Sequence, residues 1–120
     1  MKKILIAEDN DSNFILMTYI LKKYYQFERA KNGQEAVEMV GKDHFDIVLM
    51  DIKMPIMDGL EATKAIREFN SEVPIVALTA NAFDSDRQAA MEAGCNDFLA
   101  KPVSSDICLA TLEKIFGKLG

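Results

Sequence analysis

Residues 46–51, Asp-Ile-Val-Leu-Met-Asp, form a short apolar run that stops at the carboxylate of Asp51. Two other runs have the same form: residues 3–7, Lys-Ile-Leu-Ile-Ala, lead into Glu8 and Asp9, and residues 97–100, Asp-Phe-Leu-Ala, lead into Lys101. Short and mostly apolar runs are typical of strands buried in a parallel sheet. Since ligands bind at the carboxyl ends of such strands, the three runs predict one polar site of three acids and one Lys. Acids beside a Lys suggest a divalent cation held together with an anion.

Segments of helical period separate these runs along the chain. That alternation predicts an α/β fold with a five-stranded parallel sheet, doubly wound, with helices on both faces. The expected strands are residues 3–7, 27–30, 46–50, 74–79 and 97–100, and the expected helices are residues 12–24, 33–40, 60–67, 84–93 and 104–118. Tyr24 and Ile107 are assigned to the buried stripes of the first and last helices, and Gly41 to a helix C-cap.

Length and composition bound the possible functions. The chain has 120 residues, of which 49% are hydrophobic, so residues 1–120 are expected to form a single domain with one core and no output domain. The formal net charge of -5 and the scattered Lys and Arg residues argue against direct nucleic-acid binding. The charged helical residues Arg67, Asp86 and Arg87 are assigned to solvated faces.

Signals for metal binding, disulfides and targeting are weak. Cys95 and Cys108 lack His or Cys neighbours at metal-ligand spacing, which indicates reduced thiols. His44, the only His, stands in no motif and is assigned to an exposed turn. The start is too short for a signal peptide and no run is long enough to span a membrane. We expect a cytoplasmic domain with no direct membrane insertion, which leaves open a membrane-anchored parent chain.

Glu8 and Asp9 are adjacent acids directly after a buried strand. Repulsion and burial disfavour their ionisation unless a cation is present, and Mg²⁺ prefers oxygen ligands of this kind. An acidic pair in a solvated loop explains the same two residues equally well. Asp51 is the sharper signal, because the first and third strands of a doubly wound sheet are neighbours and Asp51 would face the pair. A carboxylate there can act as a covalent nucleophile toward a phosphoryl group that a metal orients.

Thr79 and Lys101 lie at the ends of the fourth and fifth expected strands. The Thr hydroxyl can donate and accept a hydrogen bond at the same sheet edge. The Lys ammonium is a compact charge that can contact a phosphoryl oxygen. Taken alone, each is as well explained as a surface residue, so their meaning comes from the combination with Glu8, Asp9 and Asp51.

These five residues and their flanks resemble the response-regulator receiver domain of two-component signalling over essentially the whole chain. Residues 50–59, Met-Asp-Ile-Lys-Met-Pro-Ile-Met-Asp-Gly, look like its phosphoacceptor loop, and residues 78–80 and 101–102 look like its switch segments. The resemblance implies a flavodoxin-like sheet with strand order 2-1-3-4-5. Residues 7–10, 78–83 and 93–102 look most like the receivers of hybrid histidine kinases.

The resemblance also implies roles for the acids. Asp51 would accept a phosphoryl group from a phosphohistidine of a histidine kinase or a histidine phosphotransfer domain. Asp9, Asp51 and the backbone carbonyl of Lys53 would bind Mg²⁺, with Glu8 acting directly or through water. Such a domain phosphorylates and dephosphorylates itself, so its status as an enzyme is left open.

Thr79 and Lys101 would hold the phosphoryl oxygens, and Thr79 and Phe98 would form the conformational switch. Because Phe98 lacks a phenol hydroxyl, only the packing part of that switch is available. The side chains of Lys53 and Asn81 would border the path of the hydrolytic water and tune the phosphoryl lifetime. The bond between Lys101 and the following proline is expected to be cis. Dimerisation or effector contact would use the fourth helix, the fifth strand and the fifth helix.

Three alternatives compete with this interpretation. A phosphatase of the haloacid-dehalogenase type also uses Mg²⁺ and a nucleophilic Asp, but it would need a second Asp where this chain has Lys53. A flavin-binding module would need a phosphate-binding loop after the first strand, where residues 8–11 are acidic or amide side chains. A receiver that has lost phosphorylation would lack at least one site residue, and here all are present.

Overall fold

The computed structural model describes residues 1–80 and 84–119 of the chain, and its fold is the predicted one. Five parallel strands form one sheet in the order β2-β1-β3-β4-β5. Their bounds are β1 (Lys3–Ala7), β2 (Gln26–Ala30), β3 (Ile47–Asp51), β4 (Ile75–Thr79) and β5 (Asp97–Ala100). The order reverses between β1 and β3, and the crevice at such a point is where doubly wound sheets bind ligands.

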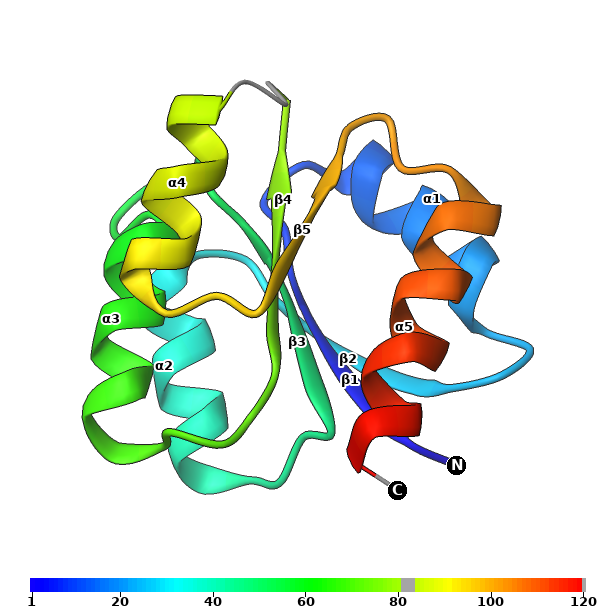
Figure 1. Cartoon of the computed structure of the whole chain (residues 1–120), viewed down its shortest axis with the longest axis horizontal. Coiled ribbons are helices and arrows are strands. Elements are labelled where there is room, and N and C mark those ends of the chain that lie inside the picture. Colours follow the sequence, from blue (N-terminus) through cyan, green and yellow to red (C-terminus); the bar gives the residue numbers. More distant parts are fainter. Residues whose placement is uncertain (81–83, 120) are drawn as a thin grey trace.

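Helices cover both faces of the sheet (Figure 1). They are α1 (Asp11–Leu21), α2 (Gly33–Lys42), α3 (Gly59–Phe69), α4 (Asp84–Ala93) and α5 (Ser105–Leu119). Figure 1 shows α2, α3 and α4 on one face and α1 and α5 on the other. Side chains alternate along β3, so Val48 and Met50 pack toward the first group of helices and Ile47 and Leu49 toward the second. The central strands are therefore buried on both sides, which explains their continuous apolar runs.

Three helices begin at side chains that cap their first turn. Asn10, Asn32 and Asp58 are the N-caps of α1, α2 and α3, and each side chain accepts a hydrogen bond from a backbone amide three residues later. Such caps satisfy amide groups that have no partner inside the helix. Each of these helices directly follows a strand end and its loop, so the caps fix where the loops at the carboxyl edge of the sheet stop.

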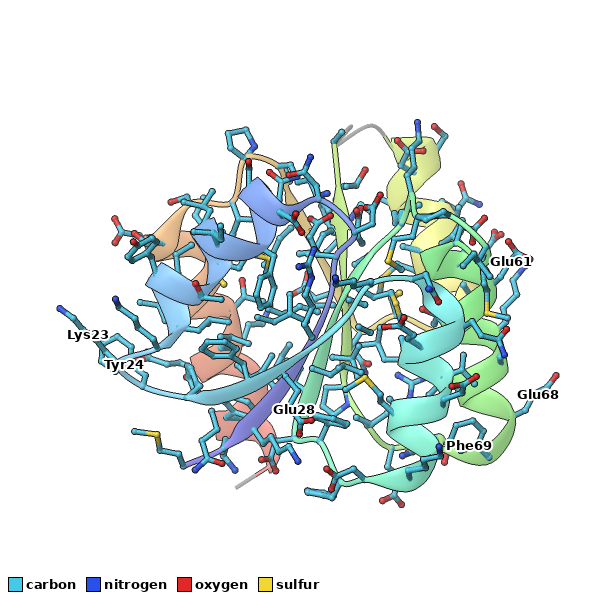
Figure 2. The ribbon with its side chains drawn as sticks, turned by 180° about the vertical axis from the view of Figure 1, so that it is seen from behind. Lys23, Tyr24, Glu28, Glu61, Glu68 and Phe69 are labelled. Atoms are coloured by element: carbon cyan, nitrogen blue, oxygen red, sulfur yellow. The ribbon has the colours of Figure 1, made fainter. Side chains whose placement is uncertain are left out.

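Three details of the predicted helices are wrong. Helix α1 ends at Leu21, and Tyr24 is 56% exposed because the chain turns there to pair Gln26 with β1; Figure 2 shows Tyr24 pointing away from the body of the domain. Gly41 lies inside α2, whose C-cap is Asp43. Ile107 is 61% exposed, since the buried stripe of α5 instead passes through Cys108, Leu112 and Phe116 at a spacing of four residues.

Arg67 is also not the solvated residue that its sequence position suggested. Its guanidinium is half-buried and donates hydrogen bonds to the carbonyl oxygens of Gly94 at 3.0 Å and Val73 at 2.7 Å, and to Asn96 Oδ1 at 2.8 Å. These bonds tie the end of α3 to the turns that precede β4 and β5. Arg67 therefore helps to position the two strands that carry Thr79 and Phe98.

Within residues 1–80 and 84–119, none of the helices combines the length and the apolar character needed to cross a membrane.

Candidate functional site

The strand register brings the predicted acids to one edge of the sheet. Ala7 of β1 pairs with Met50 of β3, so Glu8 follows one strand at the level where Asp51 ends the next. One carboxylate oxygen each from Glu8, Asp9 and Asp51 lies within 4.8 Å of the others. Glu8 is 0% exposed and Asp51 is 4% exposed, whereas Asp9 is open to solvent. Three oxygens at this spacing fit the ligand set of a single divalent cation.

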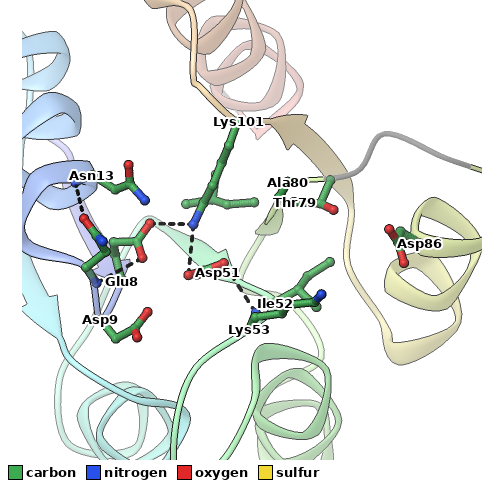
Figure 3. Close-up of a pocket in the computed structure, with 12 residues that line it drawn as sticks. Glu8, Asp9, Asn13, Asp51, Ile52, Lys53, Thr79, Ala80, Asp86 and Lys101 are labelled. Carbon is green, nitrogen blue, oxygen red and sulfur yellow. Dashed lines mark hydrogen bonds and ion pairs between the residues drawn. The ribbon is translucent and has the colours of Figure 1, made fainter.

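Lys101 connects the two buried acids. Its Nζ lies 2.8 Å from Glu8 Oε1 and 3.0 Å from Asp51 Oδ2 (Figure 3). The backbone amide of Lys101 donates to the carbonyl oxygen of Thr79 at 2.8 Å, so β4 and β5 hold these two residues together. The Lys101–Pro102 peptide bond is cis, as expected.

Burial sets the electrostatics of this cluster. It raises the pKa of the Glu8 carboxyl, and the neighbouring Asp51 raises it further, while Lys101 opposes both effects. Burial alone would lower the pKa of Lys101, but its contacts with Glu8 and Asp51 outweigh burial and raise it. Lys101 therefore keeps its proton, and two buried carboxylates share a single positive charge.

The backbone after Asp51 is fixed by close contacts. The amide of Lys53 lies 3.4 Å from Asp51 Oδ1, and the amide of Gly59 donates to the carbonyl oxygen of Ile52 at 2.8 Å. A Cβ at Gly59 would overlap the carbonyl oxygen of Asp51, so only glycine allows α3 to begin this near the strand end. Ile56, which lies in the loop between Lys53 and Gly59, adopts a positive φ of 71° and is exposed. The loop thus returns to the strand it left and keeps Lys53 beside Asp51.

An open pocket of about 230 Å³ lies over the cluster. It is lined by all five residues singled out in the sequence, Glu8, Asp9, Asp51, Thr79 and Lys101, and also by Asn10, Asn13, Ile52, Lys53, Leu78, Ala80 and Asp86. Thr79 is buried at the wall of the pocket. Asn81, predicted to tune the phosphoryl lifetime, lies outside the described residues.

Two residues of α4 that the sequence analysis assigned to solvent contribute here. Asp86 lines the pocket from the first turn of α4. The Arg87 guanidinium lies over the ring of Phe98, 4.8 Å from its centroid, and Phe98 is half-buried against the α2–α3–α4 face. In the sequence, Asp86 and Arg87 are marked only by their position in the first turn of the helix that follows β4. That position does not determine which way a side chain points.

The fold and the site together define a class of protein: a doubly wound α/β domain with a buried strand-end carboxylate, two more acids and a Lys in one open pocket. A carboxylate held in this way can act as a nucleophile toward a phosphoryl group beside a cation. Comparison with known proteins gives the same class. The model of the response regulator receiver domain matches residues 4–113. The chain therefore belongs to this family, the receiver domains of two-component signalling.

Individual relatives agree. The chain is 42% identical to hybrid signal transduction histidine kinase M of Dictyostelium discoideum over 93% of its own length, but it spans only 5% of that kinase. The receiver domain of a sensor histidine kinase from Pseudomonas aeruginosa PAO1, described with magnesium coordinated in its active-site cleft, superposes with a TM-score of 0.91 at 36% identity, covering 97% of this chain and 98% of that one.

A third relative is the receiver domain of the Saccharomyces cerevisiae response regulator Ssk1, solved in complex with the histidine phosphotransfer protein Ypd1. It superposes with a TM-score of 0.84 at 36% identity, covering 95% of this chain and 86% of that one. These comparisons give no support to the haloacid-dehalogenase alternative. Lys53, which stands where that alternative requires an acid, points the same way.

Proposed function

We propose that Asp51 accepts a phosphoryl group from a phosphohistidine on a histidine kinase or a histidine phosphotransfer protein. A carboxylate oxygen of Asp51 forms the new bond to phosphorus as the P–N bond to histidine breaks, and the electron pair of that bond stays on the imidazole nitrogen. The observation that carries this proposal is the position of Asp51, which is buried at a strand end, lies beside Lys101 and lines the pocket.

We propose that Asp9, Asp51 and the backbone carbonyl of Lys53 bind Mg²⁺, with Glu8 acting directly or through water. The three carboxylates fit such an ion because one oxygen from each lies within 4.8 Å of the others. Within the described part of the chain, Lys101 is the one cation paired with them, and it contacts Glu8 and Asp51. When bound, Mg²⁺ would orient and neutralise the incoming phosphoryl oxygens. The magnesium in the related Pseudomonas receiver supports the same assignment.

Lys101 and Thr79 are proposed to hold the phosphoryl oxygens once they reach Asp51. The Lys101 Nζ is already 3.0 Å from the acceptor carboxylate, and Thr79 lines the same pocket. Phe98 of β5 pairs with Ala77 of β4, the strand that ends at Thr79. Movement of Thr79 would therefore change the packing next to Phe98. Phe98 has no hydroxyl, so the ring would respond through packing and through its contact with Arg87.

The signal is proposed to leave through α4, β5 and α5, by dimerisation or by effector contact. A groove of about 280 Å³ runs along β5 and the start of α5, lined by residues that include Phe98, Ala100 and Ile107. Its contact with Phe98 links it to the proposed switch. We propose that residues 1–120 act as one receiver domain in the cytoplasm, where a kinase has access to ATP, and that Lys53 and Asn81 tune the phosphoryl lifetime.

The test is intact mass after incubation with acetyl phosphate, with and without Mg²⁺. The proposal predicts gain of one phosphoryl group that requires both Mg²⁺ and Asp51, so Asp51→Asn should stay unmodified. A folded parent protein that gains no group with any phosphodonor, or an Asp51→Asn variant that gains one equally well, would contradict it. Melting curves with Mg²⁺ show in parallel whether each protein is folded.

A further inference from the structure

Among the described residues that line the pocket, Asp86 is the one charged residue without a role in the proposed phosphorylation of Asp51. It lies in the first turn of α4, is half-buried, and lines the same cavity as Asp51 and Lys53. Figure 3 shows its carboxylate on the opposite side of the pocket from Glu8 and Asp9. The pocket therefore has acids on two walls.

Among the residues that the structure describes, the Asp86 carboxylate has no ion-pair partner. Glu8 and Asp51 share the ammonium group of Lys101. By contrast, no ion pair or side-chain hydrogen bond joins Asp86 to residues 1–80 or 84–119, and Lys53 likewise has no ion pair within that part of the chain. A charge on a cleft wall is screened less than one on open surface, so its field extends over a donor in the pocket.

A donor that reacts with Asp51 must place its leaving group on the open side of the pocket, because the phosphorus has to lie between Asp51 and that group. With an acyl phosphate, the P–O bond breaks and the leaving group departs as a carboxylate anion. With a P–N donor, the nitrogen keeps the electron pair of the broken bond and takes up a proton from solvent, so it leaves neutral or cationic. A carboxylate on the pocket wall repels the anionic leaving group, does not repel a neutral nitrogen leaving group, and attracts a cationic one.

We propose that Asp86 is a specificity-determining residue that favours phosphodonors with a nitrogen leaving group over acyl phosphates. This inference deepens the proposed function and rests on Asp51 being the acceptor. It assigns the donor class by charge: Asp86 favours nitrogen-linked phosphoryl groups, such as that of phosphohistidine, and limits modification by small acyl phosphates.

The experiment compares two small donors, acetyl phosphate and phosphoramidate, at saturating Mg²⁺. Initial rates of phosphorylation are measured by intact mass for the parent, for Asp86→Asn and for Asp86→Ser. Asp106→Asn is the matched control, because Asp106 is an exposed acid in the first turn of α5, outside the pocket, and its removal changes the net charge equally. Melting curves show whether each variant is folded. If Asp86→Asn does not fold, Asp86→Ser provides the same test.

Removing the Asp86 charge should raise the acetyl phosphate rate roughly two- to fivefold and should not raise the phosphoramidate rate by as much, with the difference shrinking at high ionic strength. Asp106→Asn should keep the parent's ratio of the two rates. The inference is overturned if both Asp86 variants keep that ratio while Asp51 is still phosphorylated. Absence of any adduct that depends on Asp51 in the parent would instead overturn the proposed function itself.

Discussion

The two ends of the sheet both carry acids, a Lys and a cavity, and only one of them resembles a reactive site. At the carboxyl edge, Glu8 and Asp51 are buried and share Lys101. At the opposite edge, Lys3 Nζ contacts Asp43 Oδ2 at 2.5 Å, and the Lys3 amide donates to Asp46 Oδ2 at 2.7 Å. The cavity there, at about 310 Å³, is larger than the 230 Å³ pocket over Asp51.

The pKa of Glu8 at the carboxyl edge and the pKa values of Asp43 and Asp46 at the other edge shift in opposite directions. At the carboxyl edge, burial raises the pKa of Glu8. At the other edge, the hydrogen bond from Lys3 lowers the pKa of Asp43. For Asp46, burial alone would raise the pKa, but hydrogen bonds from the Lys3 amide and His44 outweigh it and lower the pKa. Burial with too few counter-charges, rather than charge or cavity size, therefore distinguishes the functional edge.

The largest expected difference between the two ends of the sheet is in the rate of Asp51 phosphorylation when Lys101 or Lys3 is replaced. Lys101→Met should slow phosphorylation of Asp51 by acetyl phosphate about a hundredfold, because the group proposed to neutralise the phosphoryl oxygens is lost. Lys3→Met should leave that rate unchanged, since Lys3 is at the far edge. Intact-mass time courses measure both rates. Equal rates in parent and Lys101→Met would remove Lys101 from the mechanism.

The next effect is the response of stability to Mg²⁺. At about ten times its dissociation constant, Mg²⁺ should stabilise the parent by about 1.4 kcal/mol, seen as a rise in melting temperature. Asp9→Asn should lose this response and melt roughly 3 °C higher than the parent without metal, because repulsion among the acids is relieved. Asp43→Asn should respond to Mg²⁺ as the parent does. A full response in Asp9→Asn would place the ion elsewhere.

A smaller effect should separate Arg87 from other charged residues of α4. Arg87→Ala should lower the free energy of unfolding by about 0.5–1 kcal/mol through loss of the contact with Phe98. Arg87→Lys should retain part of it, and Glu92→Gln on the same helix serves as the control. Urea denaturation measures the three variants. If Arg87→Ala is as stable as the parent, α4 is not linked to β5 through this ring.

The smallest effect concerns pH at the edge opposite the site. The pKa of Asp46 is lower in the folded chain than its usual 3.8, so its contribution to stability is present above that value and is lost as pH falls through the folded pKa. Asp46→Asn should therefore melt slightly below the parent at neutral pH, and the gap should close below about pH 4. A gap that stays constant down to pH 2 would mean that the ionised form of Asp46 does not stabilise the fold.

Most of the fold and the central part of the site could be predicted from the sequence. The runs at residues 3–7 and 46–51 are apolar because both faces of the strands are covered, and each ends where the chain meets the pocket. Asp51 and Lys101 could be found because strand ends converge in any doubly wound sheet.

The residues that were missed lie on helices. A charged residue on a helix can face solvent or a neighbouring element, and the choice depends on how the helix packs. Arg67 reaches the turns before β4 and β5, Asp86 faces the pocket, and Arg87 covers Phe98. Each of these contacts joins parts of the chain that only tertiary packing brings together, so neither spacing nor composition could have shown them.

The central claim is that the phosphoryl group is transferred to Asp51 and to no other residue. Borohydride reduces an aspartyl phosphate to homoserine, which marks the modified residue permanently. After loading with acetyl phosphate and Mg²⁺, reduction and peptide mass spectrometry should find homoserine at position 51 alone. Homoserine at another acid such as Asp9, or a stable adduct on His44 with no homoserine at all, would contradict the account.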